Sequence, residues 1–131
     1  FTYGSLMFTP IWSQLVQGQY EQVIATLNGY QRVAMRKESY PAALPKPFAS
    51  IQGVLYRDVK AADIAKLDYF EGDYYLRCSE IVTTIKGRKT PAEVYVLNKQ
   101  YRHLASATQW DINRFRLWGI KQCLQWCQGF D

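Results

Sequence analysis

Short runs of β-branched and aromatic residues, most of them ended by glycine, proline or asparagine, dominate this sequence. Such runs suit a pleated, half-buried surface and predict strands. Asn28-Gly29 is a strong hairpin signal, and the Lys86–Pro91 segment predicts a second turn. Besides a short opening strand, we expect strands over residues 21–27, 30–36, 51–59, 75–85 and 92–97.

Helical periodicity is confined to three stretches. Pro10 suits the first turn of a short helix that ends at Gly18, and a second short helix is expected over residues 61–69. A longer helix is expected over residues 110–130, with Asp111 as its cap. Its predicted apolar stripe comprises Leu117, Ile120, Leu124 and Cys127, flanked by Phe115 and Trp118.

Together these elements predict an α+β fold, a small mixed β-barrel with surrounding short helices and a C-terminal helix. The segment Tyr40–Pro47 contains three prolines, which lack a backbone donor and fix φ. We therefore expect a loop or an edge segment there. A length of 131 residues, with 48% hydrophobic and 21% charged residues, predicts one globular domain over residues 1–131.

No apolar run approaches the ~20 residues of a membrane helix, and no signal-peptide pattern is present. We expect a cytoplasmic protein without membrane partners, with a few native residues before Phe1. Three cysteines cannot all pair within one chain, and no CxxC spacing supports a zinc site. Buried or half-buried free thiols are favoured, although the spacing of Cys123 and Cys127 leaves a metal or redox role open.

The formal charge of +5 permits attraction to anionic small molecules or to nucleic acid. The basic residues are scattered, however, and the one cluster, residues 86–89, contains Gly87 and is typical of a solvated hairpin tip. No RNP-type or helix-turn-helix motif is present. We therefore expect no specific nucleic-acid partner.

The opening stretch Tyr3-Gly4-Ser5-Leu6 is the first candidate for chemistry. A strand that runs into Gly-Ser turns sharply, Gly4 has no side chain to block a ligand, and successive N–H groups there can face an anion or an oxyanion. The alternative is an ordinary strand end followed by a turn. Ser5 has no readable Asp–His partner, which excludes a serine triad.

Glu71 is the second candidate. It stands directly before Gly72, with Phe70, Tyr74 and Tyr75 close by in sequence. A carboxylate in an aromatic wall loses hydration, which raises its pKa toward the range useful for proton transfer. Glu71 is therefore a candidate general acid/base; a solvated glutamate at a helix end is the alternative.

Four further residues keep two interpretations each. Asp68 either shares a proton with Glu71 or makes a helix-end hydrogen bond or charge interaction. Arg77 and Arg32 either hold a carboxylate or line a strand face. His103, the sole histidine, is expected to be a surface or capping residue.

A series of short motifs resembles the gamma-glutamylcyclotransferase-like superfamily, close to its small, avirulence-induced-gene-like branch. The resemblance covers roughly residues 1–97, and the opening box combined with the box before Gly72 is its specific part. In chain order the motifs are Tyr3-Gly4-Ser5-Leu6, Leu27-Asn28-Gly29-Tyr30-Gln31-Arg32, Tyr40-Pro41-Ala42, Gly53-Val54-Leu55-Tyr56, Leu67-Asp68-Tyr69-Phe70-Glu71-Gly72, Tyr75-Leu76-Arg77 and Ala92-Glu93-Val94-Tyr95-Val96.

The resemblance implies a cavity at one end of a compact mixed barrel. It implies that Glu71 is the catalytic acid/base and that backbone N–H groups of the opening loop bind the substrate. The substrate-binding residues carried over by position are Tyr3, Gly4, Ser5, Leu6, Tyr75 and Tyr95.

The implied reaction is cyclisation of a small γ-glutamyl amine or peptide to 5-oxoproline, with release of the amine. It needs neither a metal nor an organic cofactor. A non-catalytic module that binds a carboxylate ligand in the same cavity is the alternative, and a nucleic-acid binder with tyrosines stacking on bases is a third. A carboxylate at the position of Glu71 favours the enzyme, because an anion binder gains nothing from it.

Overall fold

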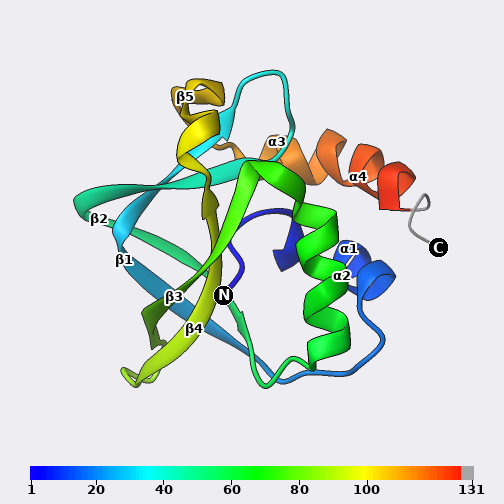
Figure 1. Cartoon of the computed structure of the whole chain (residues 1–131), viewed down its shortest axis with the longest axis vertical. Coiled ribbons are helices and arrows are strands. Elements are labelled where there is room, and N and C mark those ends of the chain that lie inside the picture. Colours follow the sequence, from blue (N-terminus) through cyan, green and yellow to red (C-terminus); the bar gives the residue numbers. More distant parts are fainter. Residues whose placement is uncertain (128–131) are drawn as a thin grey trace.

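An antiparallel sheet lies on one side of the protein and helices gather on the other (Figure 1). The structure is a computed structural model and describes residues 1–127. The path through the sheet is β2-β1-β3-β4, and β5 pairs with the last residues of β1. The strands are β1 (Gln22–Met35), β2 (Pro41–Tyr56), β3 (Tyr75–Thr84), β4 (Lys89–Leu97) and β5 (Ala105–Gln109).

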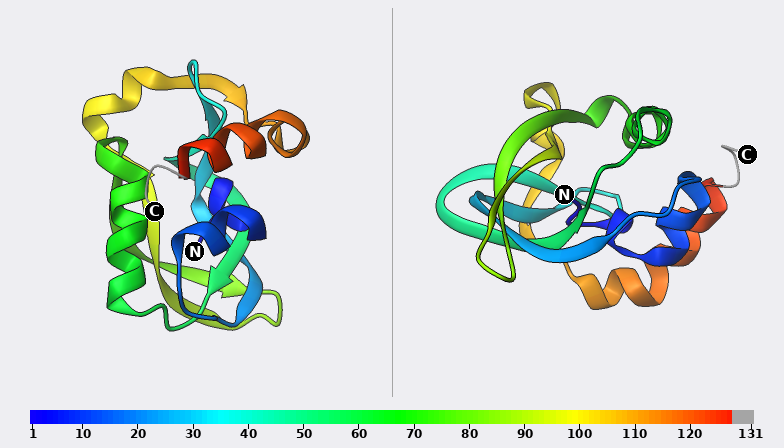
Figure 2. Two further views of the ribbon diagram at one scale, coloured as in Figure 1. Left: turned by 90° about the vertical axis from the view of Figure 1, so that its right-hand side faces the viewer. Right: turned by 90° about the horizontal axis from the view of Figure 1, so that it is seen from below.

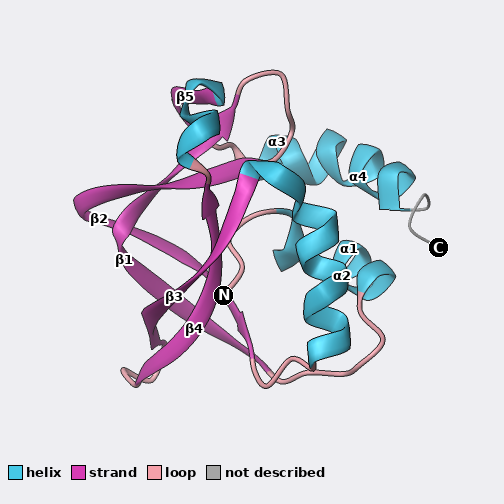
Figure 3. Cartoon of the chain, viewed as in Figure 1, coloured by secondary structure: helices cyan, strands magenta, loops and turns pink. Residues whose placement is uncertain are grey.

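The helices cover one side of this sheet (Figure 3). Within residues 1–127, none of them is long and apolar enough to span a membrane. They are α1 (Thr9–Leu15), α2 (Ala61–Glu71), α3 (Ile112–Arg114) and α4 (Ile120–Cys127), with 3₁₀ turns at Ser5–Met7, Gly72–Tyr74 and Lys99–Leu104. The α+β class is confirmed. The 3₁₀ turn after β4 and strand β5 were not predicted from the sequence.

The sheet is strongly curved but does not close (Figure 2). Strands β2 and β4 are the two ends of its path, and the opening residues lie between them. Thr2 forms an isolated bridge with Val54 on β2, and the amino group of Phe1 donates to the carbonyl of Glu93 on β4 at 2.8 Å. A single bridge is not a ladder. The predicted barrel is therefore corrected to an open, curved sheet.

Strand β1 runs without a turn through Asn28-Gly29, where the sequence predicts a hairpin. The register of the β1–β2 pair shifts there: Asn28 faces Ser50, whereas Tyr30 faces Pro45. Gly29 has a φ of 86° and occupies a bulge. Asn28 and Gly29 thus form a β-bulge within the long strand β1. The prediction of a turn at this position is wrong.

The proline segment forms the first part of β2, an edge strand. Pro41 and Pro45 pair with Ala34 and Tyr30 on β1, and the residues between Pro45 and Ser50 bulge outward. An edge strand tolerates proline because only one of its sides needs backbone donors. The edge alternative is therefore confirmed.

The C-terminal helical region keeps its predicted start and part of its predicted face. Asp111 accepts hydrogen bonds from the N–H groups of Asn113 and Arg114 at 2.9 and 3.1 Å, as a cap does. Leu117 and Trp118, however, are 74% and 72% exposed. The buried positions are Phe115, Gly119, Cys123 and Cys127.

A π turn over Phe115–Gly119 accounts for this difference. Its wider turn rotates the following residues relative to a regular α-helix, so that every fourth residue faces inward. The predicted stripe is therefore wrong at Leu117 and Trp118, but Cys127 is buried and Ile120 and Leu124 pack against the core. The part of the predicted helix beyond residue 127 lies outside the described residues. The other two helices are near their predicted places: α2 extends two residues beyond 69, and α1 ends before Gly18.

The core joins the sheet to the helices. Trp12 on α1 stacks on Tyr56 of β2 with 3.6 Å between ring centroids. The same apolar cluster includes Leu6 from the opening turn and Phe70 from α2. A second cluster fills the concave side of the sheet around the fully buried Leu27, Ile51, Val82 and Val94. The segments that carry the candidate site are thus held by the core.

Candidate active site

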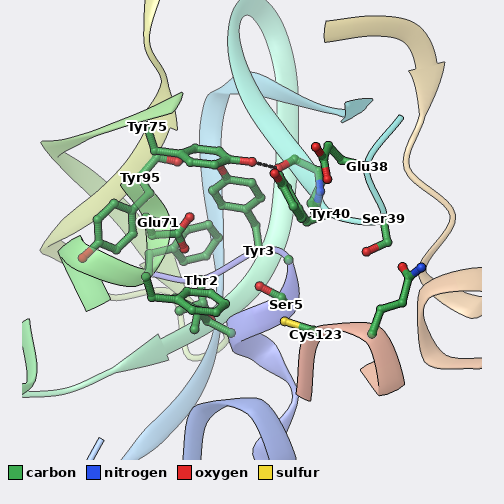
Figure 4. Close-up of a pocket in the computed structure, with 16 residues that line it drawn as sticks. Thr2, Tyr3, Ser5, Glu38, Ser39, Tyr40, Glu71, Tyr75, Tyr95 and Cys123 are labelled. Atoms are coloured by element: carbon green, nitrogen blue, oxygen red, sulfur yellow. Dashed lines mark hydrogen bonds between the residues drawn. The ribbon is translucent and has the colours of Figure 1, made fainter. Parts of the chain in front are cut away.

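A cavity of about 180 Å³ lies where the opening residues, the end of α2 and the edge strands meet (Figure 4). The structure brings together all seven residues that the sequence singles out: Tyr3, Gly4, Ser5, Leu6, Glu71, Tyr75 and Tyr95. Nine others complete the wall: Phe1, Thr2, Glu38, Ser39, Tyr40, Pro41, Phe70, Gln122 and Cys123.

The opening loop is fixed at both of its ends. Thr2 exchanges two backbone hydrogen bonds with Val54, at 2.7 and 2.9 Å, and the 3₁₀ turn begins at Ser5. Among the described residues, the N–H groups of Gly4, Ser5 and Leu6 donate to no protein acceptor. Three adjacent donors at the cavity wall are thus available to an anionic ligand group.

Gly4 is required by a close approach of the chain to itself. A β-carbon at this position would lie 2.7 Å from Cγ of Pro41 at the start of β2. The β-carbon would therefore meet the cavity wall itself.

Arg32 and Tyr3 support this loop. The guanidinium of Arg32 donates to the carbonyl of Tyr3 at 2.9 Å and lies 5.2 Å from the ring centroid of Trp110. The hydroxyl of Tyr3 donates to the carbonyl of Tyr95 and accepts from the N–H of Ala43 at 3.1 Å. Arg32 does not line the cavity; its guanidinium donates to the main chain of the loop.

Glu71 is the last residue of α2, and Gly72 follows it with a φ of 70°. Its side chain is partly buried in the cavity wall and accepts no hydrogen bond from the described residues. Burial first, and the negative charge of Asp68 second, raise the pKa of Glu71 from 4.5 to about 8. Such a carboxyl group can hold or release a proton near neutral pH.

Tyrosines form most of the polar wall around Glu71. Tyr75 donates to the carbonyl of Pro41 at 2.7 Å, and Tyr95 donates to Oδ1 of Asp68 at 2.6 Å. Burial raises the pKa of Tyr3, Tyr40, Tyr75 and Tyr95, so their hydroxyls stay neutral. Asp68 thus makes the hydrogen bond that one interpretation of the sequence expects.

Sequence reasoning missed the wall opposite Glu71. Glu38, Ser39 and Tyr40 come from the turn between β1 and β2, and Gln122 and Cys123 come from α4. Figure 4 shows Glu38 and Glu71 on either side of the Tyr3 ring in that view. Of these residues only Tyr40 stands in a motif, Tyr40-Pro41-Ala42; the others are brought to the cavity by the tertiary fold alone.

The remaining candidate residues lie elsewhere. His103 is an exposed residue of the 3₁₀ turn after β4, and Arg77 pairs with Asp68 and Glu93. Burial raises the pKa of the Cys123 thiol to about 12, so it is no nucleophile at neutral pH. No group of three or more potential metal-ligating side chains occurs in residues 1–127.

The fold and the cavity define a class: α+β proteins with a partly buried carboxyl group in an aromatic cavity beside a loop of backbone amides. The chain belongs to the family described as gamma-glutamyl cyclotransferase, AIG2-like, whose model matches residues 1–112. The match extends beyond the motifs recognised in the sequence and includes the whole sheet.

Individual relatives agree with this assignment. Protein AIG2 C of Arabidopsis thaliana is 26% identical over 119 residues, which are 89% of this chain and 71% of the relative. AIG2-like protein C of the same plant is 28% identical over 118 residues, covering 88% and 67%.

The fold is also that of solved structures. An Arabidopsis thaliana protein solved in solution superposes with a TM-score of 0.71 at 23% identity, over 99% of this chain and 85% of that one. A structure described as a gamma-glutamyl cyclotransferase superposes with a TM-score of 0.64 at 19% identity, over 77% and 71%. At these identities the likeness shows the shared fold.

Proposed function

We propose that this protein is a cofactor-independent γ-glutamylcyclotransferase that converts a small γ-glutamyl amine or peptide to 5-oxoproline and releases the amine. One observation carries the proposal. Glu71, whose pKa is raised to about 8 and which has no protein hydrogen-bond partner among the described residues, shares an aromatic cavity with three unpaired loop amides. Family membership supports the same reaction type.

The reaction requires proton transfer more than a protein nucleophile. The α-amine of the substrate attacks its own γ-carbonyl carbon, forming the ring C–N bond, and the original amide C–N bond then breaks. Glu71 takes a proton from the α-ammonium group and delivers it to the leaving nitrogen. Because the nucleophile belongs to the substrate, its high effective concentration lowers the barrier.

The loop amides have a separate task. The N–H groups of Gly4, Ser5 and Leu6 bind the α-carboxylate of the substrate or the oxyanion that forms at the γ-carbonyl. The neutral tyrosines exclude water from the cavity and keep these hydrogen bonds strong.

The alternative is a non-catalytic module that binds a carboxylate ligand. The sixteen lining residues include Glu38 and Glu71 but neither lysine nor arginine. A site that only holds an anion is weakened whenever these carboxyl groups are ionised, and no lysine or arginine of the lining offsets them. The composition of the wall therefore favours the enzyme.

A screen of γ-glutamyl compounds for 5-oxoproline release tests the proposal. We expect turnover of at least one compound and, for Glu71→Gln, a loss of at least roughly 100-fold in kcat. The amide keeps the shape of the side chain but cannot accept the proton. Near wild-type activity in Glu71→Gln would refute the role given to Glu71.

Glu80→Gln is the matched control, because Glu80 lies outside the cavity, where it accepts from Tyr30. It is expected to retain activity. Circular dichroism of both variants separates a chemical loss from a folding loss. If no compound is turned over, but 5-oxoproline or glutamate binds equally to the wild type and to Glu71→Gln, the binding module is the correct function.

A further inference from the structure

A polar cluster stands directly behind the wall of the cavity, between α2, β3 and β4. Nε of Arg77 donates to Oδ1 of Asp68 at 2.9 Å, and its Nη2 lies 3.4 Å from Oδ2. Nη1 of Arg77 donates to Oε1 of Glu93 at 3.1 Å, and Ser79 donates to Oε2 of the same glutamate at 2.9 Å. Asp68 is thus held in one orientation by a two-point contact.

Tyr95 links this cluster to the cavity. Its hydroxyl donates to Oδ1 of Asp68 at 2.6 Å, its carbonyl accepts from Tyr3, and its ring lines the cavity beside Glu71 (Figure 4). The Tyr95 hydroxyl has a single proton to donate, and it donates this proton in the hydrogen bond to Asp68. The orientation of this part of the wall therefore depends on Asp68.

Asp68 also precedes Glu71 by three residues on α2, a spacing that places both on neighbouring parts of the helix surface. Most of the other titratable groups around Glu71 are neutral near pH 8; the two exceptions are the carboxyl groups of Glu38, in the same cavity lining, and of the exposed Asp73. The neutral groups are Tyr3, Tyr40, Tyr75, Tyr95, Cys123 and the amino group of Phe1, whose pKa is lowered to about 6.

We propose that Asp68 is a positioning residue for Glu71: through Tyr95 and Arg77 it fixes the aromatic wall and the local electric field in which Glu71 exchanges its proton. Arg77 sets how much of the Asp68 charge Glu71 experiences. This inference rests on the proposed function for its catalytic consequence, but its electrostatic content concerns the unliganded protein.

The cluster makes a two-sided prediction. Asp68→Asn keeps an oxygen for Tyr95 to donate to but removes the negative charge, so the proton affinity of Glu71 falls. Arg77→Met leaves the Asp68 charge unpaired, so the proton affinity rises. Arg77→Lys keeps the positive charge and is expected to lie close to the wild type.

The direct measurement is a carboxyl ¹³C titration of Glu71 by NMR without substrate, with the signal assigned by its absence in Glu71→Gln. We expect the midpoint to move down by roughly one pH unit in Asp68→Asn and up in Arg77→Met. The acid limb of the kcat/KM profile is expected to move in the same directions. Asp73→Asn removes a carboxylate two residues from Glu71 but outside the cluster, and should move neither.

The outcomes separate the two proposals. Shifted titrations without turnover of any γ-glutamyl compound would leave the electrostatic role of Asp68 standing and refute the proposed function. Turnover in the wild type, with an unshifted Glu71 midpoint and pH profile in both Asp68→Asn and Arg77→Met, would overturn this inference. A shift of equal size in Asp73→Asn would also overturn it, because any nearby carboxylate would then suffice.

Discussion

The position of Glu71 in the cavity wall lowers the stability of the folded protein when its carboxyl group is ionised. An ionised carboxylate without a hydrogen-bond partner is unfavourable in an aromatic wall, and its pKa rises to about 8 as a result. Residues that serve only the fold are seldom kept in such surroundings. The pKa of Glu71 therefore predicts a measurable effect on folding as well as on activity.

Glu71→Gln is expected to be more stable than the wild type at high pH. Below about pH 4.5 the carboxyl group is protonated in both folded and unfolded chains. As the pH rises from 4.5 to about 8, the unfolded chain loses this proton while the folded chain keeps it, so the wild type loses stability. Glutamine has no such proton.

Thermal unfolding at pH 5, 7 and 9 measures this effect. The Tm difference between Glu71→Gln and the wild type should increase from pH 5 to pH 9, whereas Glu80→Gln should show no such trend. A Tm difference that is constant across this range would mean that the carboxylate of Glu71 is well solvated.

Some residues of the candidate site can be predicted from the local sequence, and others cannot. Glu71 and the opening loop stand in short motifs in which a glycine adjoins the functional group, so local sequence reveals them. Gln122 and Cys123 line the cavity from α4, which follows a π turn, and no short motif of the sequence marks them.

At the scale of elements, local signals predicted strands and helices well where they agreed with packing. Strand β1 shows what happens where they disagree: Asn28-Gly29 favours a turn, but pairing with both β2 and β3 keeps the strand continuous. The turn preference of Asn28 and Gly29 produces only a β-bulge in the strand. Long-range pairing of this kind cannot be read from a window of a few residues.

The end of α2 makes a prediction of its own. Gly72 has a φ of 70°, and no atom lies within 4 Å of the position that a β-carbon would take. With a ψ of −160°, Gly72 occupies a region that essentially only glycine adopts, so Gly72→Ala is expected to cost about 1–3 kcal/mol through backbone strain alone. Since relief of the strain would turn the end of the helix, kcat should fall as well.

Gly29→Ala is the matched control, because Gly29 also has a positive φ and open space around it but lies in the β1 bulge. Chemical denaturation should give similar losses of stability for the two variants, whereas only Gly72→Ala should reduce kcat. Equal activities in both variants would show that the geometry at Gly72 does not matter for Glu71.

At the scale of the whole molecule, the net charge of +5 is the property that could also indicate nucleic-acid binding. We expect nucleic acid to bind weakly, without sequence preference and with strong dependence on salt, because the positive charge is scattered. Fluorescence anisotropy with labelled oligonucleotides at increasing salt measures this. Tight binding to one defined oligonucleotide at physiological salt would contradict it.

The cavity wall combines residues 1–6 with Gln122 and Cys123, which lie near opposite ends of the described chain. Between them the wall takes residues from the β1–β2 turn, from α2, from β3 and from β4. During synthesis, the first wall residues leave the ribosome long before the last ones are made. A nascent chain that has not yet extended past α4 therefore has an incomplete cavity, and any ligand that needs the whole wall binds only after α4 has been made.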